Sequence, residues 1–395
     1  MQGKPARADE KRSSEIGHRL LQPSLCLTVL FLWMASCFPV QATSLTLPPT
    51  LPSQNPCIID FPFSDINAPY SIDFGASGGG NTNIGPIFDI TEDHQAPHSF
   101  SDHSAFATLD TGYWSCFRSG RWFIIAGSGN RQQYQGNRDA GQIWIDTHSD
   151  TSLAGNKSPQ LAMYDLQMKW YGIGYQMPYR HQNIHGTTWV MARYLDPQEL
   201  LMGTAIGDVD GSDYTGMVRL LSTKERPQAS GRGWALDAGF SSQIGRDLRC
   251  SISAEGLLGE ITWKNISVSD LYVSSPRVFE DPNGFFHDYF DAEGAQWRED
   301  LHCTITPVVT TMVGYGQKPM ISTGIRYQNK KAIPIFGAAM PWPGHGTSFI
   351  DIQPTYSSCE IGYSGKHGAI SLLFNGLPQT AKNASIQLRF NTLSF

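Results

Sequence analysis

The residues that decide the fold are the last eleven of the chain, "SIQLRFNTLSF" (385–395), which end on an aromatic side chain. Leu388 and Phe390 alternate with polar residues, so one face of an extended segment is apolar and the other is polar. The apolar face resumes at Leu393 and Phe395 after one extra residue, which a β-bulge would accommodate. The alternation therefore predicts a half-buried β-strand that includes the C-terminal residue.

The same alternation recurs in short segments from residue 70 onward, and Gly, Pro, Asn and Asp separate these segments. Their apolar faces carry Tyr70, Ile72 and Phe74; Tyr164, Leu166, Met168 and Trp170; Trp234, Leu236 and Phe240; Ile321, Ile325 and Tyr327; and Ile350 and Ile352. The opposite faces mix small residues with single charges of either sign, whereas the outside of a two-sheet sandwich is usually rich in Lys and Glu. A crowded, polar lumen would suit such faces, although a sandwich core could use the same apolar residues.

Composition excludes one class of partner. The chain has 395 residues, of which only 16% are charged, and a formal net charge of -6. Because these values give no basic surface, we expect no nucleic-acid partner. The low charge is also unusual for a soluble protein of this length.

The N-terminus resembles an export signal. A basic stretch that includes Lys11, Arg12 and Arg19 precedes an apolar run, and a small-residue cleavage pattern ends at Ala42. We expect export and removal of residues 1–42. An uncleaved anchor and lipid attachment at Cys37 are the alternatives.

Aromatic residues lie near several predicted strand ends, where an interfacial girdle would place them: Tyr164, Trp170, Trp189, Tyr194, Trp234 and Tyr327. Together with export and alternation, the final residues resemble the C-terminal sorting signal of bacterial outer-membrane β-barrel proteins. The matching positions are Leu388, Phe390, Leu393 and Phe395. The resemblance implies outer-membrane lipid and the barrel-assembly machinery as partners, and the outer membrane of a diderm bacterium as the location.

The expected fold class is therefore all-β, a closed antiparallel transmembrane β-barrel. Closure pairs every backbone N–H and C=O group, as hydrocarbon requires. The segment count predicts about 14 strands, within a range of about 12 to 16. The expected organisation is a signal peptide (1–42), a Pro-rich segment or small plug (43–69), and the barrel (70–395).

Three functions fit such a barrel. A passive or selective channel for a small solute would use charged residues in its lumen. The candidates for lining it are Asp73, Asp165, Lys169, Arg193, Arg219, Asp237, Arg249, Glu255, Arg326, Asp351 and Arg389. The alternatives are a barrel similar to fatty-acid transporters, which would carry a hydrophobic substrate, and a surface protein without transport activity, for which the irregular, acidic and aromatic segment 279–300 would be a binding loop.

Local motifs of catalysis are absent from the sequence, so we expect no catalytic residues, cofactor or metal, and an outer-membrane hydrolase is a less favoured alternative. The segment 89–103 gathers His and acidic residues without a metal-binding spacing, and an external loop is the simpler interpretation. The acidic segment 207–216 resembles a calcium loop but lacks its final Glu, which favours a hairpin turn.

Overall fold

The computed structural model describes residues 45–47, 70–84, 100, 102–148, 155–210, 213–225, 229–274, 277–280, 286–289, 292–328, 331–342, 346–365, 367–376 and 381–394. The chain divides into two units, Met1–Ser44 and Leu45–Phe395, and every described element belongs to the second. The predicted signal peptide therefore lies outside the described residues. So does the Pro-rich segment, apart from residues 45–47.

The described part of the second unit consists almost entirely of strands. They are β1 (Leu45–Leu47), β2 (Tyr70–Thr82), β3 (Ser104–Ser119), β4 (Trp122–Asn137), β5 (Asn156–Lys157), β6 (Gln160–His181), β7 (Ile184–Asp210), β8 (Asp213–Ser222), β9 (Ser230–Ile244), β10 (Leu248–Ser274), β11 (Arg277–Glu280), β12 (Phe286–Tyr289), β13 (Ala292–Ile305), β14 (Val308–Tyr315), β15 (Met320–Gln328), β16 (Lys331–Trp342), β17 (Gly346–Gln353), β18 (Ser358–Gly365), β19 (Gly368–Phe374) and β20 (Asn383–Ser394). One α-helix, α3 (Arg138–His148), and one 3-10 turn, η1 (Pro354–Tyr356), complete the described elements.

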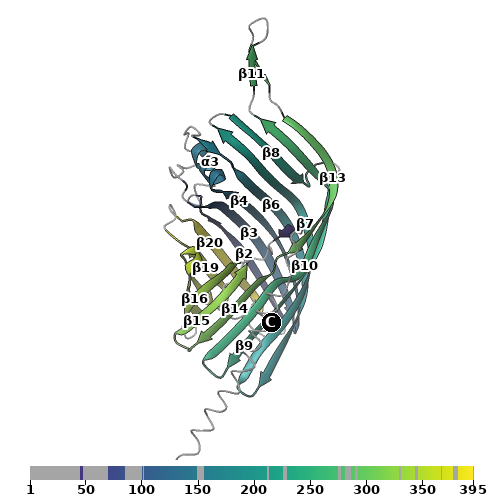
Figure 1. The fold of residues 1–395 in the computed structure, drawn as a ribbon. Coiled ribbons are helices and arrows are strands. Elements are labelled where there is room, and N and C mark those ends of the chain that lie inside the picture. Colours follow the sequence, from purple (N-terminus) through teal and green to yellow (C-terminus); the bar gives the residue numbers. More distant parts are fainter. Residues whose placement is uncertain are drawn as a thin grey trace, which may run out of the picture. The chain divides into compact units, whose positions relative to one another are not determined.

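The strands β2–β10 and β13–β20 close into a barrel in which neighbours run antiparallel (Figure 1). β1 pairs parallel with β13, and β11 and β12 form a separate two-stranded sheet. β8 and β9 share one strand position of the barrel, because each pairs with β7 on one side and with β10 on the other. β13 and β14 share another position, because both pair with β10, and β14 pairs with β15 on its other side. The last strand, β20, pairs with β2, which closes a barrel of 14 strands. The predicted fold class and strand number are confirmed.

The closing seam contains the predicted bulge. Ile72 pairs with Leu393 and Asp73 pairs with Asn391, so Thr392 is the extra residue on β20. Before the bulge, Phe390 pairs with Phe74, and both side chains are exposed on the outer face. Phe395 lies outside the described residues.

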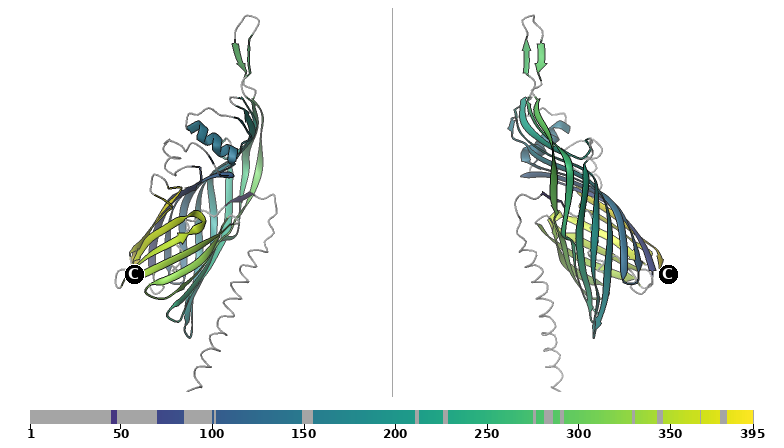
Figure 2. Two further views of the ribbon diagram at one scale, coloured as in Figure 1. Left: turned by 60° about the vertical axis from the view of Figure 1, so that its left-hand side comes forward. Right: turned by 90° about the vertical axis from the view of Figure 1, so that its right-hand side faces the viewer.

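The barrel wall is much taller on one side than on the other (Figures 1 and 2). β6 has 22 residues and β7 and β10 have 27 each, whereas β17 and β18 have 8 and β19 has 7. A strand rises about 3.3 Å per residue, so the tall side extends well beyond the short side. We call the end at which β2, β4, β7 and β10 finish the loop end, and the opposite end the turn end.

The outer face carries a belt of exposed apolar side chains on every side of the barrel. On the tall side, Tyr171, Tyr194 and Trp234 form one row across β6, β7 and β9. Just beyond that row toward the loop end, the outer face of β6 carries Lys169, and at the level of the row Glu260 pairs with Trp234 and accepts a hydrogen bond from its indole at 3.1 Å. An apolar belt bounded by aromatic residues is typical of a barrel surrounded by lipid. Within the described part of the chain, no helix is long and apolar enough to cross a membrane.

The loops at the two ends differ in length. At the turn end the connections are short, for example 120–121 and 182–183, whereas α3 lies between β4 and β6 at the loop end. The prediction of an irregular loop over 279–300 is wrong for residues 292–300, which form the start of β13 and pair with β10. The sequence did not predict this strand, because its glycine and charged residues interrupt the apolar alternation. Its pairing with β10, rather than its own pattern, makes it a strand.

The two segments considered for metals have simple structural roles where they are described. The segment 207–216 contains the end of β7 and the start of β8, which pair as the predicted hairpin. Most of 89–103 lies outside the described residues. Among the residues that are described, no three His, Cys, Asp or Glu side chains form a metal-binding group.

Helix α3 packs at the loop end through one buried side chain and a set of polar contacts. Ile145 is buried against Ile84, Phe100, Ala105 and Ala107. At its N-terminus, the side-chain oxygen of Asn137 accepts a hydrogen bond from the backbone N–H of Ala140 at 3.0 Å, which caps the helix. The helix is therefore held to the strands that flank it.

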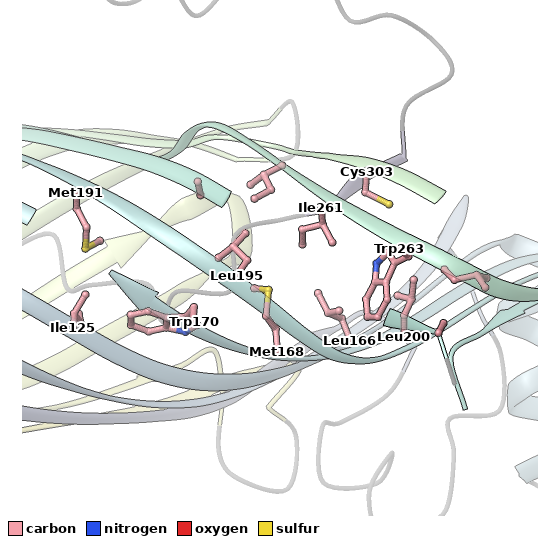
Figure 3. Close-up of a cluster of buried hydrophobic side chains, with 14 of the residues drawn as sticks. Ile125, Leu166, Met168, Trp170, Met191, Leu195, Leu200, Ile261, Trp263 and Cys303 are labelled. Carbon is pink, nitrogen blue, oxygen red and sulfur yellow. The ribbon is translucent and has the colours of Figure 1, made fainter. Parts of the chain in front are cut away.

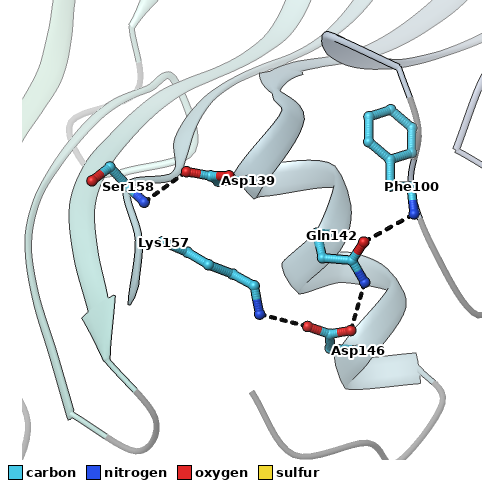
Figure 4. Close-up of polar contacts among 6 residues, drawn as sticks. All are labelled: Phe100, Asp139, Gln142, Asp146, Lys157 and Ser158. Carbon is cyan, nitrogen blue, oxygen red and sulfur yellow. Dashed lines mark hydrogen bonds and ion pairs between the residues drawn. The ribbon is translucent and has the colours of Figure 1, made fainter. Parts of the chain in front are cut away.

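Figure 4 shows the polar contacts of α3. Lys157 donates a hydrogen bond to Asp146 at 2.7 Å, and the amide of Gln142 donates to the same carboxylate at 2.7 Å. Ser158 donates its backbone N–H to Asp139 at 2.9 Å. Burial alone would raise the pKa of Asp146, but the hydrogen bonds from Lys157 and Gln142 outweigh it and lower the pKa below its ordinary value.

This shift predicts an acid-sensitive helix contact. A carboxyl group with a lowered pKa stabilises the folded contact above its ordinary pKa, and that contribution is lost as the pH falls through the lowered value. We expect the backbone amides of α3 to exchange faster with solvent in strongly acidic buffer than near neutrality, after correction for intrinsic rates. Asp146→Asn should remove this pH dependence. An unchanged dependence in Asp146→Asn would contradict the assignment.

Candidate functional site: the inner face of the barrel

The inner face of the tall side is apolar over seven strands, from β3 to β13 (Figure 3). The buried side chains of this cluster are Cys116, Phe123, Ile125, Leu166, Met168, Trp170, Trp189, Met191, Leu195, Leu200, Ala229, Ala235, Ile261, Trp263, Ile266, Val268, Cys303 and Ile305. We call this set the apolar wall. All of its members are at most 9% exposed, so its Trp, Met and Leu side chains pack closely against neighbouring side chains inside the barrel.

Glycines allow the aromatic rings of the apolar wall to lie along the sheet. A Cβ atom at Gly127 would overlap the indole of Trp170, and one at Gly174 would overlap the ring of Phe123. Each glycine pairs across strands with the aromatic residue that covers it. The rings therefore cover neighbouring backbone, an arrangement that also helps to fix strand register.

Within the wall lies a buried ion pair. Arg193 on β7 and Asp237 on β9 approach to 2.6 Å, and their side chains are 1% and 0% exposed. The guanidinium carbon of Arg193 lies 6.0 Å from the centre of the Trp170 ring. Because both side chains are buried and hydrogen-bonded to each other, the pair fixes the positions of β7 and β9 side chains in this part of the lumen.

A bulge in β10 supports the same pair. Pairing between β9 and β10 shifts between Ala254 and Leu258, and Gly256 has a φ of 60°, which favours glycine. The backbone N–H of Gly256 thereby donates to the carboxylate of Asp237 at 2.6 Å. Glu255, on the same bulge, is also buried.

Other charges lie elsewhere on the inner face. Arg131 donates to Asp110 at 2.8 Å near the apolar wall, and Asp73 lies 3.7 Å from Arg389 at the closing seam. On the short side the buried polar residues are Ser322, Asp351, Gln353, Ser358, Glu360 and Ser371. The short side also buries the apolar cluster Met320, Ala339 and Phe349. The inner face is therefore largely apolar on the tall side and mixed on the short side, where polar, charged and apolar residues alternate with one another.

The structure distributes the predicted lining residues over three places. Asp73, Arg193, Asp237, Arg249, Glu255, Arg326, Asp351 and Arg389 lie on the inner face of the closed barrel. Arg219 lies on the inner face of the tall side beyond the short strands. Asp165 and Lys169 lie on the outer face, because β6 points its even-numbered side chains inward.

The structure of β6 also corrects the prediction of which residues face the lipid. Leu166, Met168 and Trp170 were expected on the lipid face, but they are buried inside. Trp189, expected in the girdle, is also buried inside, whereas Tyr194 is exposed outside. In β6 both faces carry large apolar residues at different heights, so alternation alone could not identify the inner face.

Sequence reasoning did not identify the apolar wall as a site, nor Asp110, Arg131 and Glu360 as lumen residues. One available signal was the series Gly172 and Gly174, which alternates with exposed aromatic and aliphatic residues on β6. Small residues on one face of a strand indicate that large side chains from neighbouring strands cover that face. The covering residues themselves could not be found without the register.

Comparison with known proteins identifies no family, since no protein-family model and no curated protein matches the chain. Among solved structures, the translocator domain of the autotransporter NalP from Neisseria meningitidis is similar at 9% identity, covering 83% of this chain and 89% of that one, with a TM-score of 0.25. The alcaligin outer membrane receptor FauA from Bordetella pertussis has 8% identity, coverages of 84% and 77%, and a TM-score of 0.18. A mutant of the Rh. blastica porin has 10% identity, coverages of 82% and 100%, and a TM-score of 0.16. TM-scores this low give no indication of the function of this chain.

Proposed function

We propose that this protein is a selective channel of the bacterial outer membrane that conducts apolar or amphipathic small molecules. The observation that carries the proposal is the apolar wall, which covers the inner face of the tall side over seven strands. An inner surface of this kind disfavours hydrated ions, because a polar solute would lose water without gaining hydrogen bonds. A solute with an apolar body gains by leaving water there.

The outer face supports the proposed location. Exposed apolar residues surround the barrel, and on the tall side an aromatic row separates them from charged residues. A sheet closed without edges satisfies its backbone hydrogen bonds in hydrocarbon. We therefore infer outer-membrane lipid and the barrel-assembly machinery as partners, as the resemblance of the last strand implies. Export after cleavage near Ala42 is part of the same proposal.

The polar short side gives the channel its selectivity. Asp351 and Glu360 are buried opposite the apolar wall, and Arg193 and Asp237 interrupt that wall with one fixed ion pair. A solute that passes along the short side meets these hydrogen-bonding groups beside the apolar side chains of Met320, Ala339 and Phe349. This favours amphipathic molecules over saturated hydrocarbons and over fully hydrated sugars. Transport, rather than catalysis, is the chemistry that these surfaces support.

Dye uptake by whole cells tests the proposal. In diderm cells whose outer membrane excludes the apolar dye N-phenylnaphthylamine, expression of this protein should accelerate dye entry several-fold. Entry of nitrocefin, a polar β-lactam measured by its hydrolysis in the periplasm, should change little. Faster nitrocefin entry with unchanged dye entry would indicate an aqueous pore and contradict the proposal. Equal acceleration of both would indicate a leaking membrane and also contradict it.

A further inference from the structure

The inner face of the tall side continues beyond the short strands as an exposed surface. Alternation along β7 places Ile206 on the same face as the buried Leu200. Ile206 pairs with Met217 on β8, which pairs with Tyr272 on β10, so the three side chains form one row. They are 59%, 58% and 49% exposed, respectively. Contiguous exposed apolar residues of this size mark a binding surface.

A polar row follows toward the closed barrel. Arg219 on β8 lies 3.6 Å from Asp270 and 3.8 Å from Glu299, and its guanidinium carbon lies 5.6 Å from the centre of the Trp297 ring. Both ion-pair distances are longer than direct hydrogen bonds, so each group keeps donors or acceptors for a ligand. All three charged side chains are between about one third and one half exposed.

A third row joins this surface to the apolar wall. Met202, Leu221 and Val268 pair across β7, β8 and β10 on the same face. Val268 belongs to the apolar wall, and Met202 and Leu221 pack against it. The exposed row at Ile206 and Met217 is therefore continuous with the buried apolar wall.

We propose that these rows form a capture site, made of Ile206, Met217, Arg219, Tyr272 and Trp297, for a neutral amphipathic molecule on its way into the lumen. The proposal rests on the proposed function and names its substrate class. The head group is argued from charge: a carboxylate that pairs with Arg219 would also face Asp270 and Glu299, and an ammonium group that pairs with these carboxylates would also face Arg219. An uncharged head with hydroxyl groups can accept from Arg219 and donate to both carboxylates. Its apolar chain would lie against Ile206, Met217 and Tyr272.

Equilibrium binding to the full mature barrel in lipid nanodiscs tests the site without requiring transport. Three probes share a dodecyl chain and differ in the head: dodecyl maltoside, dodecanoate and dodecyltrimethylammonium, each below its micelle concentration. Empty nanodiscs measure partition into lipid. We expect dodecyl maltoside to bind the wild type more tightly than either charged probe. Met217→Asp should weaken that binding about tenfold or more.

The matched control is Leu161→Asp on β6. Leu161 is 38% exposed and pairs with Ala205, the neighbour of Ile206, so it lies on the opposite face of the same wall. This variant should bind like the wild type. Equal binding by wild type and Met217→Asp, or a preference for a charged head, would overturn the capture site. Dye uptake in cells reports separately on the proposed function: normal wild-type uptake with no maltoside binding would remove the capture site and leave the channel.

Discussion

Replacing Asp237 with alanine is expected to lower the free energy of unfolding of the barrel by about 3 to 5 kcal/mol. The carboxylate of Asp237 pairs with Arg193 at 2.6 Å and also accepts the backbone N–H of Gly256. Its removal leaves a guanidinium group in the lumen wall that is 1% exposed and has lost its counter-charge. The midpoint of urea unfolding, followed by the gel mobility of unheated samples, measures the loss.

Two controls separate a buried charge from a lost contact. The double variant Arg193→Met/Asp237→Leu removes both charges, and we expect it to recover most of the stability, because paired burial of ions carries a large desolvation cost. Lys224 and Glu199 approach to 2.9 Å, but their side chains are 59% and 46% exposed. Lys224→Ala should therefore change the midpoint of urea unfolding very little. Similar losses for Asp237→Ala and Lys224→Ala would contradict the burial of the pair.

Phe395→Ser is expected to reduce the amount of assembled barrel in the outer membrane several-fold while export and signal cleavage continue. One surface aromatic side chain contributes only about 1.5 to 3 kcal/mol of burial, which is too little to unfold a barrel with many such contacts. A strong effect would therefore arise in assembly, when the last strand is recognised before it pairs with β2. Quantification of the heat-modifiable form in membrane fractions measures it.

Phe374→Ser controls for the loss of an outward aromatic side chain. Phe374 on β19 is 37% exposed and lies away from the C-terminus. This variant should assemble at close to the wild-type level. If Phe395→Ser also assembles like the wild type, the C-terminal aromatic residue is incidental, and the argument from the last strand to the outer membrane fails.

The fold could be predicted because a barrel wall repeats one local pattern. In β2, β9, β15 and β17, apolar residues alternate with small or charged ones, and the exposed side chains are those that alternation placed on the outer face. The bulge at Thr392 was also visible, because it interrupts an otherwise regular alternation. Closure followed from the need to pair every backbone group in lipid.

The candidate site could be predicted only in part, because it depends on register and strand height. Asp237 and Arg193 are far apart in sequence, and only the pairing of β7 with β9 brings them together. Trp170 looks like a girdle residue in the sequence, since it has apolar neighbours at alternating positions. In the structure Trp170 points inward. β6 continues toward the loop end past the lipid belt, and there its outer face carries Lys169 rather than an apolar residue. The sequence did not reveal that β6 is 22 residues long, so the heights at which its two faces meet lipid could not be predicted.

The most direct test of the channel is to block the apolar wall in the folded protein. Met191 on β7 is buried in that wall, and its neighbour Ala192 lies on the outer face. Because Cys116 and Cys303 belong to the same wall, both are first replaced by alanine. In cells that express Met191→Cys in this background, a bulky thiol reagent should abolish the protein-dependent uptake of N-phenylnaphthylamine. The same treatment should leave uptake unchanged in Ala192→Cys in this background, and the treated background itself controls for the remaining cysteines. Full dye uptake after confirmed labelling of Met191→Cys, or a residue at 191 that no reagent of solute size can reach, would contradict a transport path along this wall.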